Sequence, residues 1–471
     1  MTAVVTVCGD SGSVASTPVP GTVTAVDVSG GSTGLTFTGG PVTGSGTITV
    51  SGTLVPANGG TGVTTPYTYD VRRYGAVMDG VTNDSAALQA AIDAASAAGP
   101  SNATVVIPPG YMRLSTPIDL SDKGGTVNGN RPLRIRGSGA GIYGLGGSTT
   151  LILDTAATSP VAFCILGRSY ITFEDMYVAA TWDDGSTGTF PLNPIPNRST
   201  VAFMLGRSTT SHYAQFVRFK NVTVYMHDEA VGVNSGRGAI AIYNMGAEHG
   251  AYDGCYFVGN TGTLIAKGDV LSVGSPYGSV YTGTTSFVKF TDCVFQSQTL
   301  TTAPVNIWYE TSDLDFDHCI WTGPAGIATT MFAITSAAGK GACQNITFKE
   351  FHSEAPNQIG TIAGQVDRLT INGGIGNNSA ATYLALNANV GTVALVNGLD
   401  FDVVQLNGSG QNLFTAGATG PVIQGFRAKL YNGQTINTPN LSIVGGRVTN
   451  CGGGAFAVTA LLAGSSVAVD N

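Results

Sequence analysis

The chain has 471 residues, of which 66 are Gly and only 11% are charged, against about 25% in an average soluble domain. This low charge argues against a helix-rich enzyme surface, whereas abundant Gly, Thr, Ser and Val favour many short strands joined by tight turns. The 43% hydrophobic content can offset chain entropy and argues against disorder. The net charge is −8 and Lys and Arg form no runs, so no nucleic-acid-binding surface is expected.

The start of the chain and its cysteines bear on the compartment. The first eight residues, MTAVVTVC, have no positively charged region and do not resemble a secretory signal. No stretch approaches the ~20 apolar residues that span a bilayer. Seven cysteines without a CxxC pair favour free buried thiols over a disulfide framework or a metal site. We therefore expect synthesis in a cytoplasm, no membrane insertion, and neither a metal nor an organic cofactor.

Residues 1–65 contain no helix pattern. They hold short alternating segments, such as 46–51 (GTITVS), between Gly-Gly and Pro turns. This segment has few large apolar residues and is not expected to bury a core alone. It needs sister chains or a docking partner to become ordered.

Residues 66–129 contain the clearest helix pattern of the chain. The triplet 83–85 (Asn-Asp-Ser) can begin a helix, because its side-chain oxygens can accept unpaired backbone N–H groups of the first turn. Gly99-Pro100 ends the pattern. Between these limits apolar residues recur along one helical face: Ala87, Leu88, Ala91, Ile92 and Ala95. The segment 104–107 (TVVI) predicts a strand, which Pro-Pro-Gly at 108–110 ends.

From about residue 130 to the end, the chain repeats one motif, two short apolar strands joined by a polar bend. Clear copies begin at residues 171, 217, 288, 314, 346, 369 and 393. The last four starts are 32, 23 and 24 residues apart, and longer earlier intervals indicate loop insertions. This period is typical of a parallel β-helix, whose coils stack about 4.8 Å apart so that equivalent residues form columns.

Two columns can be aligned from these copies. The bend column is predicted to contain Asp175, Asn221, Asp292, His318, Glu350, Gly373 and Asn397. The next, inward-pointing column is predicted to contain Met176, Val222, Cys255, Cys293, Cys319, Phe351, Gly374 and Gly398. Three cysteines are thereby explained as small buried hydrophobes.

The segment 69–76 (YDVRRYGA), followed by Asp79-Gly80, the Ala-rich helix and 105–111 (VVIPPGY), resembles the opening segment of pectate-lyase-like β-helices, which are common in phage tail spikes. The resemblance implies an all-β fold, a single-stranded right-handed parallel β-helix whose open end is covered by the helix. Asp79 is interpreted as a turn residue and Asp84 as a helix cap.

A second resemblance covers the N-terminal arm. Segments 28–37, 44–53 and 57–62 are similar to segments of phage tail-fibre proteins. Such proteins are usually trimers whose N-terminal part attaches to the tail. The resemblance implies a virion-attachment arm at 1–65, the start of the β-helix with its capping helix at 66–129, and a body at 130–471 whose last coils could form a trimer end.

The densest group of acidic residues consists of Glu310, Asp313, Asp315 and Asp317. The residues between the aspartates are apolar and point inward in the predicted coil, so the aspartates share an outer face about 6.5 Å apart. Glycan cleavage uses two carboxylates roughly 5–10 Å apart, which makes Glu310, Asp313 and Asp315 the candidate catalytic residues. For Asp315 a surface ion pair with Lys289, one coil earlier, is the alternative.

Aromatic rings commonly form platforms for sugars, and exposed loops often carry binding function. The candidate glycan-binding residues are Trp182, Asp183, Asp184, Trp308, Tyr309 and Trp321. The first three lie in the Gly/Pro-rich insertion 180–199, for which a solvated loop tip is the alternative. Trp321 ends a repeat where Phe295 stands one coil earlier, so a core position is also open. The segment 350–354 (EFHSE) places His352 between two glutamates, which suggests proton chemistry or a plain polar face.

Three functions follow from these patterns. The first is a virion tail spike or tail fibre, trimeric and attached to phage tail or adaptor proteins through residues 1–65, that binds a host surface glycan. The second is a glycan depolymerase, a glycosidase or lyase, and the sequence leaves open whether the protein is an enzyme. The third is a secreted polysaccharide lyase or glycoside hydrolase of bacterial origin.

Overall fold

The computed structural model describes residues 24–52, 67–98, 103–121, 132–140, 148–155, 161–179, 201–206, 213–226, 240–259, 261–266, 285–297, 303–308, 310–322, 329–335, 341–353, 356–376, 382–386, 394–405, 412–417, 420–430, 434–450 and 458–470. The chain divides into two compact units, Met1–Pro66 and Tyr67–Asn471.

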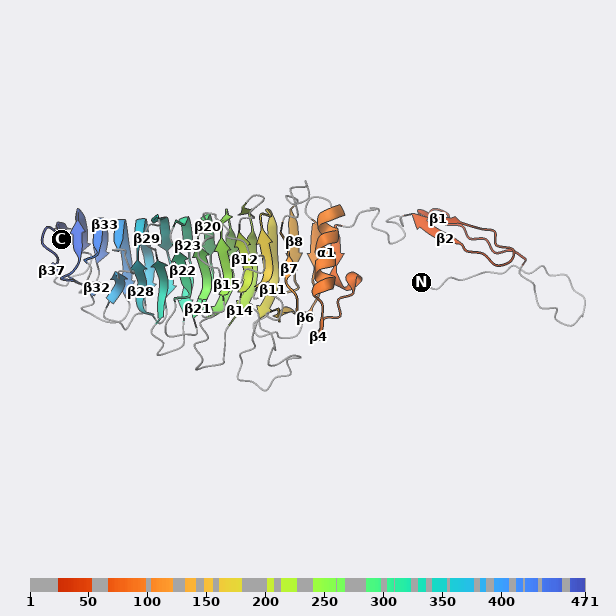
Figure 1. Cartoon of the computed structure of the whole chain (residues 1–471), viewed down its shortest axis with the longest axis horizontal. Coiled ribbons are helices and arrows are strands. Elements are labelled where there is room, and N and C mark those ends of the chain that lie inside the picture. The colour runs from red at the N-terminus through yellow and green to blue at the C-terminus, as the bar shows by residue number, and fades with distance from the viewer. Residues whose placement is uncertain are drawn as a thin grey trace, which may run out of the picture. The chain divides into compact units, whose positions relative to one another are not determined.

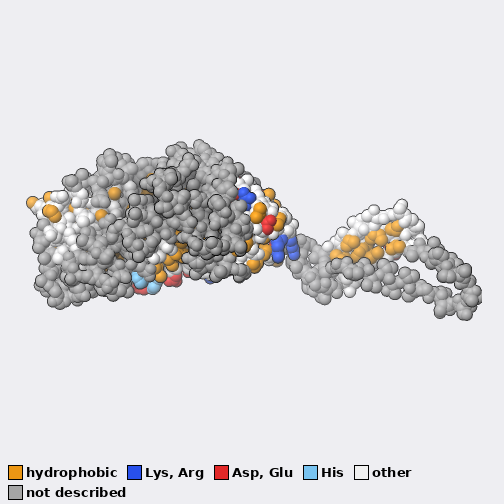
Figure 2. All heavy atoms as spheres, turned by 90° about the horizontal axis from the view of Figure 1, so that it is seen from below, with side chains coloured by type: hydrophobic (Ala, Val, Ile, Leu, Met, Phe, Trp, Pro, Cys, Tyr) orange, Lys and Arg blue, Asp and Glu red, His pale blue; other side chains and the backbone are white. Residues whose placement is uncertain are grey.

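The first unit contains an antiparallel hairpin of β1 (Leu35–Thr38) and β2 (Thr49–Gly52). Phe37 lies opposite Val50, and Leu35 shares their face because side chains alternate along a strand. Thr and Ser occupy the other face. Figure 2 shows hydrophobic side chains gathered over this hairpin. A two-stranded sheet is marginally stable at best on its own, and here the described part of the chain covers its apolar face only in part, since Leu35 and Phe37 are half-buried and Val50 is exposed.

The second unit is a stack of parallel strands, coil upon coil, with α1 at one end and the C-terminal coils at the other (Figure 1). The right-handed parallel β-helix predicted from the sequence is confirmed. One face is a ten-stranded parallel sheet. Its strands are β7 (Ile118–Asp119), β10 (Val161–Leu166), β12 (Val201–Gly206), β15 (Ile240–Met245), β19 (Thr261–Ala266), β22 (Val305–Trp308), β25 (Thr329–Thr335), β28 (Pro356–Ala363), β30 (Thr382–Leu386) and β32 (Asn412–Ala416).

The other two faces are joined, because several strands run through the bend between them. Their strands are β3 (Thr68–Asp70), β4 (Asp79–Asn83), β5 (Ala103–Val106), β6 (Gly110–Leu114), β8 (Leu133–Arg136), β9 (Thr149–Leu153), β11 (Ile171–Ala179), β13 (Ala214–Gln215), β14 (Arg218–Tyr225), β16 (Ala247–Glu248), β17 (Ala251–Asp253), β18 (Tyr256–Gly259), β20 (Ser286–Thr291), β21 (Val294–Ser297), β23 (Ser312–Asp317), β24 (Ile320–Thr322), β26 (Cys343–Lys349), β27 (His352–Ser353), β29 (Gln365–Gly376), β31 (Leu395–Gln405), β33 (Val422–Leu430), β35 (Ser442–Val444), β36 (Gly446–Asn450) and β38 (Val467–Asp470). A short parallel pair, β34 (Ile436–Asn437) and β37 (Val458–Ala460), lies outside these sheets.

Stacked aromatic rings hold the core of the coils together. Phe173, Phe219, Tyr252, Phe290, Phe316 and Phe348 form one inward column, with neighbouring ring centroids 4.4–5.1 Å apart. Each is almost fully buried, and such pairs contribute about 0.5–1.5 kcal/mol beyond the burial of their area. The repeat copies at 171, 217, 288, 314, 346 and 369 are thus confirmed as coils of the stack, with one further coil, that of β17 and β18, between those at 217 and 288.

The predicted register of the copy at 393 is wrong. Leu369 pairs with Leu399, and Asn397 pairs with Asp367, which precedes a different bend. Gly398 is therefore not in the inward cysteine column. The error has a physical reason: both bends of a coil use left-handed residues, so Asn-Gly is as suitable for one as for the other.

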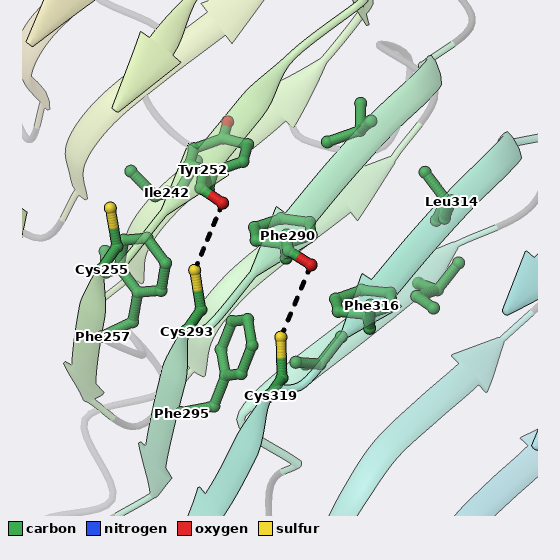
Figure 3. Close-up of a cluster of buried hydrophobic side chains, with 14 of the residues drawn as sticks. Ile242, Tyr252, Cys255, Phe257, Phe290, Cys293, Phe295, Leu314, Phe316 and Cys319 are labelled. Carbon is green, nitrogen blue, oxygen red and sulfur yellow. Dashed lines mark hydrogen bonds between the residues drawn. The ribbon is translucent and has the colours of Figure 1, made fainter. Parts of the chain in front are cut away.

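The cysteine column is confirmed. Cys255, Cys293 and Cys319 are buried as free thiols and stand one above the other (Figure 3). The Cys293 thiol donates to the carbonyl oxygen of Tyr252 at 3.5 Å, and the Cys319 thiol donates to that of Phe290 at 3.6 Å. Burial raises the pKa of the Cys293 thiol well above its ordinary value. These cysteines therefore act as core residues.

The predicted helix is confirmed as α1 (Ser85–Ala98), which follows the short 3-10 helix η2 (Val71–Tyr74). Its apolar face, including Leu88 and Ile92, is fully buried against the first coils. Asp84 precedes the helix and its carbonyl accepts from Leu88 N. Its carboxylate instead accepts from the backbone N–H groups of Val77 and Met78, at 2.8 and 3.0 Å. None of the helices among the described residues is long and apolar enough to cross a membrane.

Candidate functional site

The outer face of β20, β23 and β26 carries a network of charges, here called the charged ladder: Lys289, Asp315, Asp317 and Lys349. Parallel register places these residues on adjacent coils, with Lys289 beside Asp315 and Asp317 beside Lys349. Lys289 Nζ lies 3.1 Å from an Asp317 oxygen, and Lys349 Nζ lies 3.1 Å from an Asp315 oxygen. Each ammonium thus lies between carboxylates rather than in one isolated pair.

His318 extends this ladder at the bend. Its Nδ1 lies 2.8 Å from Asp317 Oδ1 and its Nε2 lies 2.6 Å from Glu350 Oε2. His318 and Glu350 are both left-handed, with φ of 53° and 47°, as the bend requires. Stacking at about 4.8 Å then places one side chain over the other. The imidazole therefore bridges two carboxylates at the surface of the coil.

Partial burial opposes ionisation of Asp317, but hydrogen bonds from Lys289 and His318, helped by the charge of Lys349, outweigh it and hold the pKa of Asp317 below its ordinary value. The hydrogen bond to Asp315 raises the pKa of Lys349. Asp317 is therefore an ionised acceptor that orients His318. Together with Glu350, this unit can hold or transfer a proton.

The three acidic candidates from the sequence engage different partners. Asp315 belongs to the charged ladder, where the alternative of a surface ion pair with Lys289 is seen at 3.7 Å. Asp313 lies at a bend, with φ of 56°, and its Oδ1 accepts from Asn345 Nδ2 at 2.6 Å. Glu310 Oε1 accepts from the backbone N–H of Gly341 at 3.0 Å. The predicted alternation along β23 is present, because Leu314 and Phe316 are buried between the three aspartates. Asp313, however, lies at the bend and is bonded outside the charged ladder.

Among the aromatic candidates, Trp321 is a core residue. Its side chain is only 2% exposed and stacks on Phe295 with ring centroids 5.3 Å apart. This corrects its assignment to a glycan-binding surface, because a buried ring cannot contact a polymer outside. Trp308 is half-buried at the end of β22. Trp182, Asp183, Asp184 and Tyr309 lie outside the described residues.

The sequence missed the partnership of His318 with Glu350. It grouped Glu350 with His352, its near neighbour along the chain, although the bend column already placed Glu350 directly after His318. Contacts between coils follow the column rather than the order of residues along one strand. Lys349 was missed for the same reason, since its partner Asp315 is 34 residues away.

Comparison with known proteins gives matches at two levels. The family described as rhamnogalacturonase A/epimerase, pectate lyase-like, matches residues 68–319. The mannuronan C5-epimerases AlgE1 and AlgE6 of Azotobacter vinelandii are 47% and 45% identical over 73 residues, 16% of this chain. The chain spans only 5% and 8% of the length of these two curated relatives.

Solved structures resemble the chain at 14% sequence identity. The A-module of the mannuronan C-5 epimerase AlgE6 from Azotobacter vinelandii has a TM-score of 0.45, covering 86% of this chain and 100% of that one. The Dettilon tailspike protein has a TM-score of 0.45, covering 86% and 70%. PfbA, a surface adhesin of Streptococcus pneumoniae, has a TM-score of 0.45, covering 82% and 91%. Because the family match extends over more than half of its residues, the chain belongs to the rhamnogalacturonase A/epimerase, pectate lyase-like family.

Proposed function

We propose that the protein is a virion tail spike or short tail fibre whose β-helix binds a polysaccharide of the host surface. The observation that carries this proposal is the presence, in one chain, of a β-helix of this family and a small separate unit whose apolar hairpin face is only partly covered by the described residues. The epimerase relatives are named for mannuronan, a polysaccharide, which supports the ligand class. The virion role rests on the similarity of the arm to tail-fibre segments.

The arm is assigned the attachment role for a physical reason. The first 66 residues contain no Lys, Arg or Glu and only two Asp, so ion pairs cannot order this segment. Burial of the Leu35, Phe37 and Val50 face can, and sister chains of a homotrimer or a tail or adaptor protein would supply the covering surface.

A depolymerase activity is the second candidate, because His318 lies between the carboxylates of Asp317 and Glu350. A positioned imidazole of this kind can accept a proton from a sugar or donate one to a leaving oxygen. Glu310, Asp313 and Asp315 remain proposed catalytic partners, and Trp182, Asp183, Asp184, Trp308 and Tyr309 remain proposed glycan contacts. An enzyme of this type secreted by a bacterium is the alternative to the virion protein.

The test is to incubate the purified chain with envelope polysaccharides of candidate host bacteria and to measure both binding and new reducing or unsaturated ends. Binding without new ends supports the adhesin. New ends that disappear in His318→Gln but persist in His352→Gln, the matched histidine at the neighbouring strand, support the depolymerase. An absence of binding to every polysaccharide tested would contradict the proposal.

A further inference from the structure

A second bend of the β-helix carries a column of aromatic side chains at the surface, three of them exposed and one, Phe216, half-buried. Tyr170, Phe216, His249 and Phe287 occupy equivalent positions on successive coils, just before β11, β14 and β17 and within β20. Their rings stack nearly parallel, with centroids 4.9, 4.8 and 5.0 Å apart. Tyr170 is 45% exposed and Phe287 54% exposed. We call this the aromatic column.

The backbone at the aromatic column is unfavourable for these residues. All four have φ between 55° and 61°, a left-handed conformation that is a genuine outlier for bulky side chains. The bend itself does not require them, because the same position in later coils is occupied by Gly398, Gly425 and Gly445. Strain at exposed positions that Gly would relieve is a mark of function.

Polar and apolar groups alternate along the solvent-facing edge of the aromatic column. Because the rings stack face to face, they present their edges to solvent. The Tyr170 hydroxyl and the His249 nitrogens alternate there with the apolar edges of Phe216 and Phe287. The same bend position continues with Asp313, Asn345 and Arg368, all left-handed as well. The result is a strip of alternating apolar and hydrogen-bonding groups at regular spacing along the coil axis.

Polar residues lie on both sides of the strip. On one side Gln215 donates to Glu248 at 2.7 Å, and on the other Lys289 joins the charged ladder. A protein partner favours a broad contiguous apolar patch, whereas this strip is one side chain wide. The strip is complementary to a polysaccharide, which is a line of sugar rings with apolar C–H surfaces and hydroxyl groups.

We propose that the aromatic column, continued by Asp313, Asn345 and Arg368, is a binding strip for an extended polysaccharide that lies along the coil axis. This inference rests on the proposed function and adds to it the location of the glycan and the direction in which it runs. The strip lies two residues from the charged ladder on the same outer surface, since Phe287 and Lys289 alternate with the inward Val288. The His318 unit lies at the other bend of the same coils, five residues beyond Asp313 along β23.

The test uses the double variant Phe216→Asn/Phe287→Asn, because Asn tolerates the left-handed conformation and already occupies this column at position 345. The full chain is screened on an array of bacterial surface polysaccharides, and dissociation constants are measured for those it binds. The double variant is expected to bind at least roughly tenfold more weakly. Phe216→Tyr/Phe287→Tyr, which keeps the rings, and Tyr67→Asn, at a 57% exposed aromatic outside the column, are expected to bind like the wild type.

The outcomes separate this inference from the function on which it rests. If the wild type binds and the folded double variant binds equally well, the strip is not the site, whereas the proposed function stands. If the wild type binds no polysaccharide of the array, both are overturned. Should the double variant fail to fold, Arg368→Asn removes an exposed side chain at the end of the column. It is expected to weaken binding roughly threefold or more, and unchanged binding would again overturn the strip.

Discussion

At the scale of single residues, the outer surface of the coils gains its order from contacts between neighbouring coils. Asp317 accepts from Lys289 of the preceding coil and from His318 of its own, while Glu350 of the following coil reaches the other side of His318. Individual surface ion pairs contribute little, about 0–1 kcal/mol, but a network in register restricts several side chains at once. The stack thereby positions a surface imidazole through contacts between neighbouring coils.

The lowered pKa of Asp317 makes this network sensitive to pH. A carboxyl with a lowered folded-state pKa stabilises the fold above its unfolded value, near pH ~3.9, and loses that contribution as the pH falls through the folded value. Asp317→Asn is therefore expected to lower the free energy of unfolding at pH 6 by about 1 kcal/mol or less, and the difference from wild type should shrink as the pH falls below about 4.

The measurement is denaturant unfolding of both proteins across this pH range. The matched control is Asp400→Asn, which breaks the more exposed pair of Asp400 with Arg427. It is expected to change stability at pH 6 by less than about 0.5 kcal/mol. A difference for Asp317→Asn that grows on acidification would contradict the ion-pair assignment.

Substitutions of Trp321 test whether its side chain packs in the core or binds a ligand at the surface. Trp321→Ala leaves a cavity between Phe295 and Phe348 and is expected to lower the free energy of unfolding by about 3–5 kcal/mol. The indole nitrogen is buried without a hydrogen-bond partner, so Trp321→Phe, which removes it, is expected to cost less than about 1.5 kcal/mol. Thermal unfolding of the two variants checks this. If both substitutions changed the stability by the same small amount, Trp321 would not be a core residue.

At the scale of elements, the sequence predicted what columns of apolar residues determine and missed what depends on exact register. Phe173, Phe219, Phe290 and Phe316 recur at the same place in each copy, so the coils could be recognised before their loops were understood. The bend column places His318 and Glu350 on adjacent coils, but it does not give the directions of the two side chains on which their contact depends. The aromatic column could not be predicted from the sequence, because its members differ in type and share only a backbone conformation.

The helix that closes the N-terminal end of the stack depends on Asp84. Its buried carboxylate fixes the segment before β4 through two backbone N–H groups. Asp84→Ala leaves both without a partner and is expected to destabilise the protein by about 2–3 kcal/mol. Asp79→Ala is the matched control, because exposed Asp79 also accepts from two backbone N–H groups, those of Val81 and Thr82, which water can reach.

Asp79→Ala is expected to cost below about 1 kcal/mol. Urea unfolding followed by circular dichroism compares the two variants. Similar losses for both would mean that Asp84 acts only as an exposed turn residue and that closure of the stack depends on the apolar face of α1 alone.

At the scale of the whole molecule, the two units contrast in how each can become stable. The β-helix buries a continuous column of aromatic and aliphatic residues within one chain. The arm has an apolar hairpin face that its described residues cover only in part, with Val50 exposed. Sister chains of the homotrimer that the tail-fibre resemblance implies would cover this face, and light scattering after size exclusion is then expected to give three times 47.9 kDa. A stable monomer would count against both the trimer and the proposed covering of the arm.

Removal of residues 1–65 tests whether the arm serves attachment while the β-helix serves glycan binding. The capping helix and every coil belong to Tyr67–Asn471, and each coil buries its apolar face against the next, so the truncated chain is expected to keep its β-sheet circular dichroism and to melt within about 5 °C of the full chain. It should still bind the glycan, because the aromatic column and the charged ladder remain. It should no longer be incorporated into virions, as measured by immunoblotting of particles assembled with it. Incorporation of the truncated chain would assign attachment to the β-helix, whereas unfolding would show that the arm stabilises the stack.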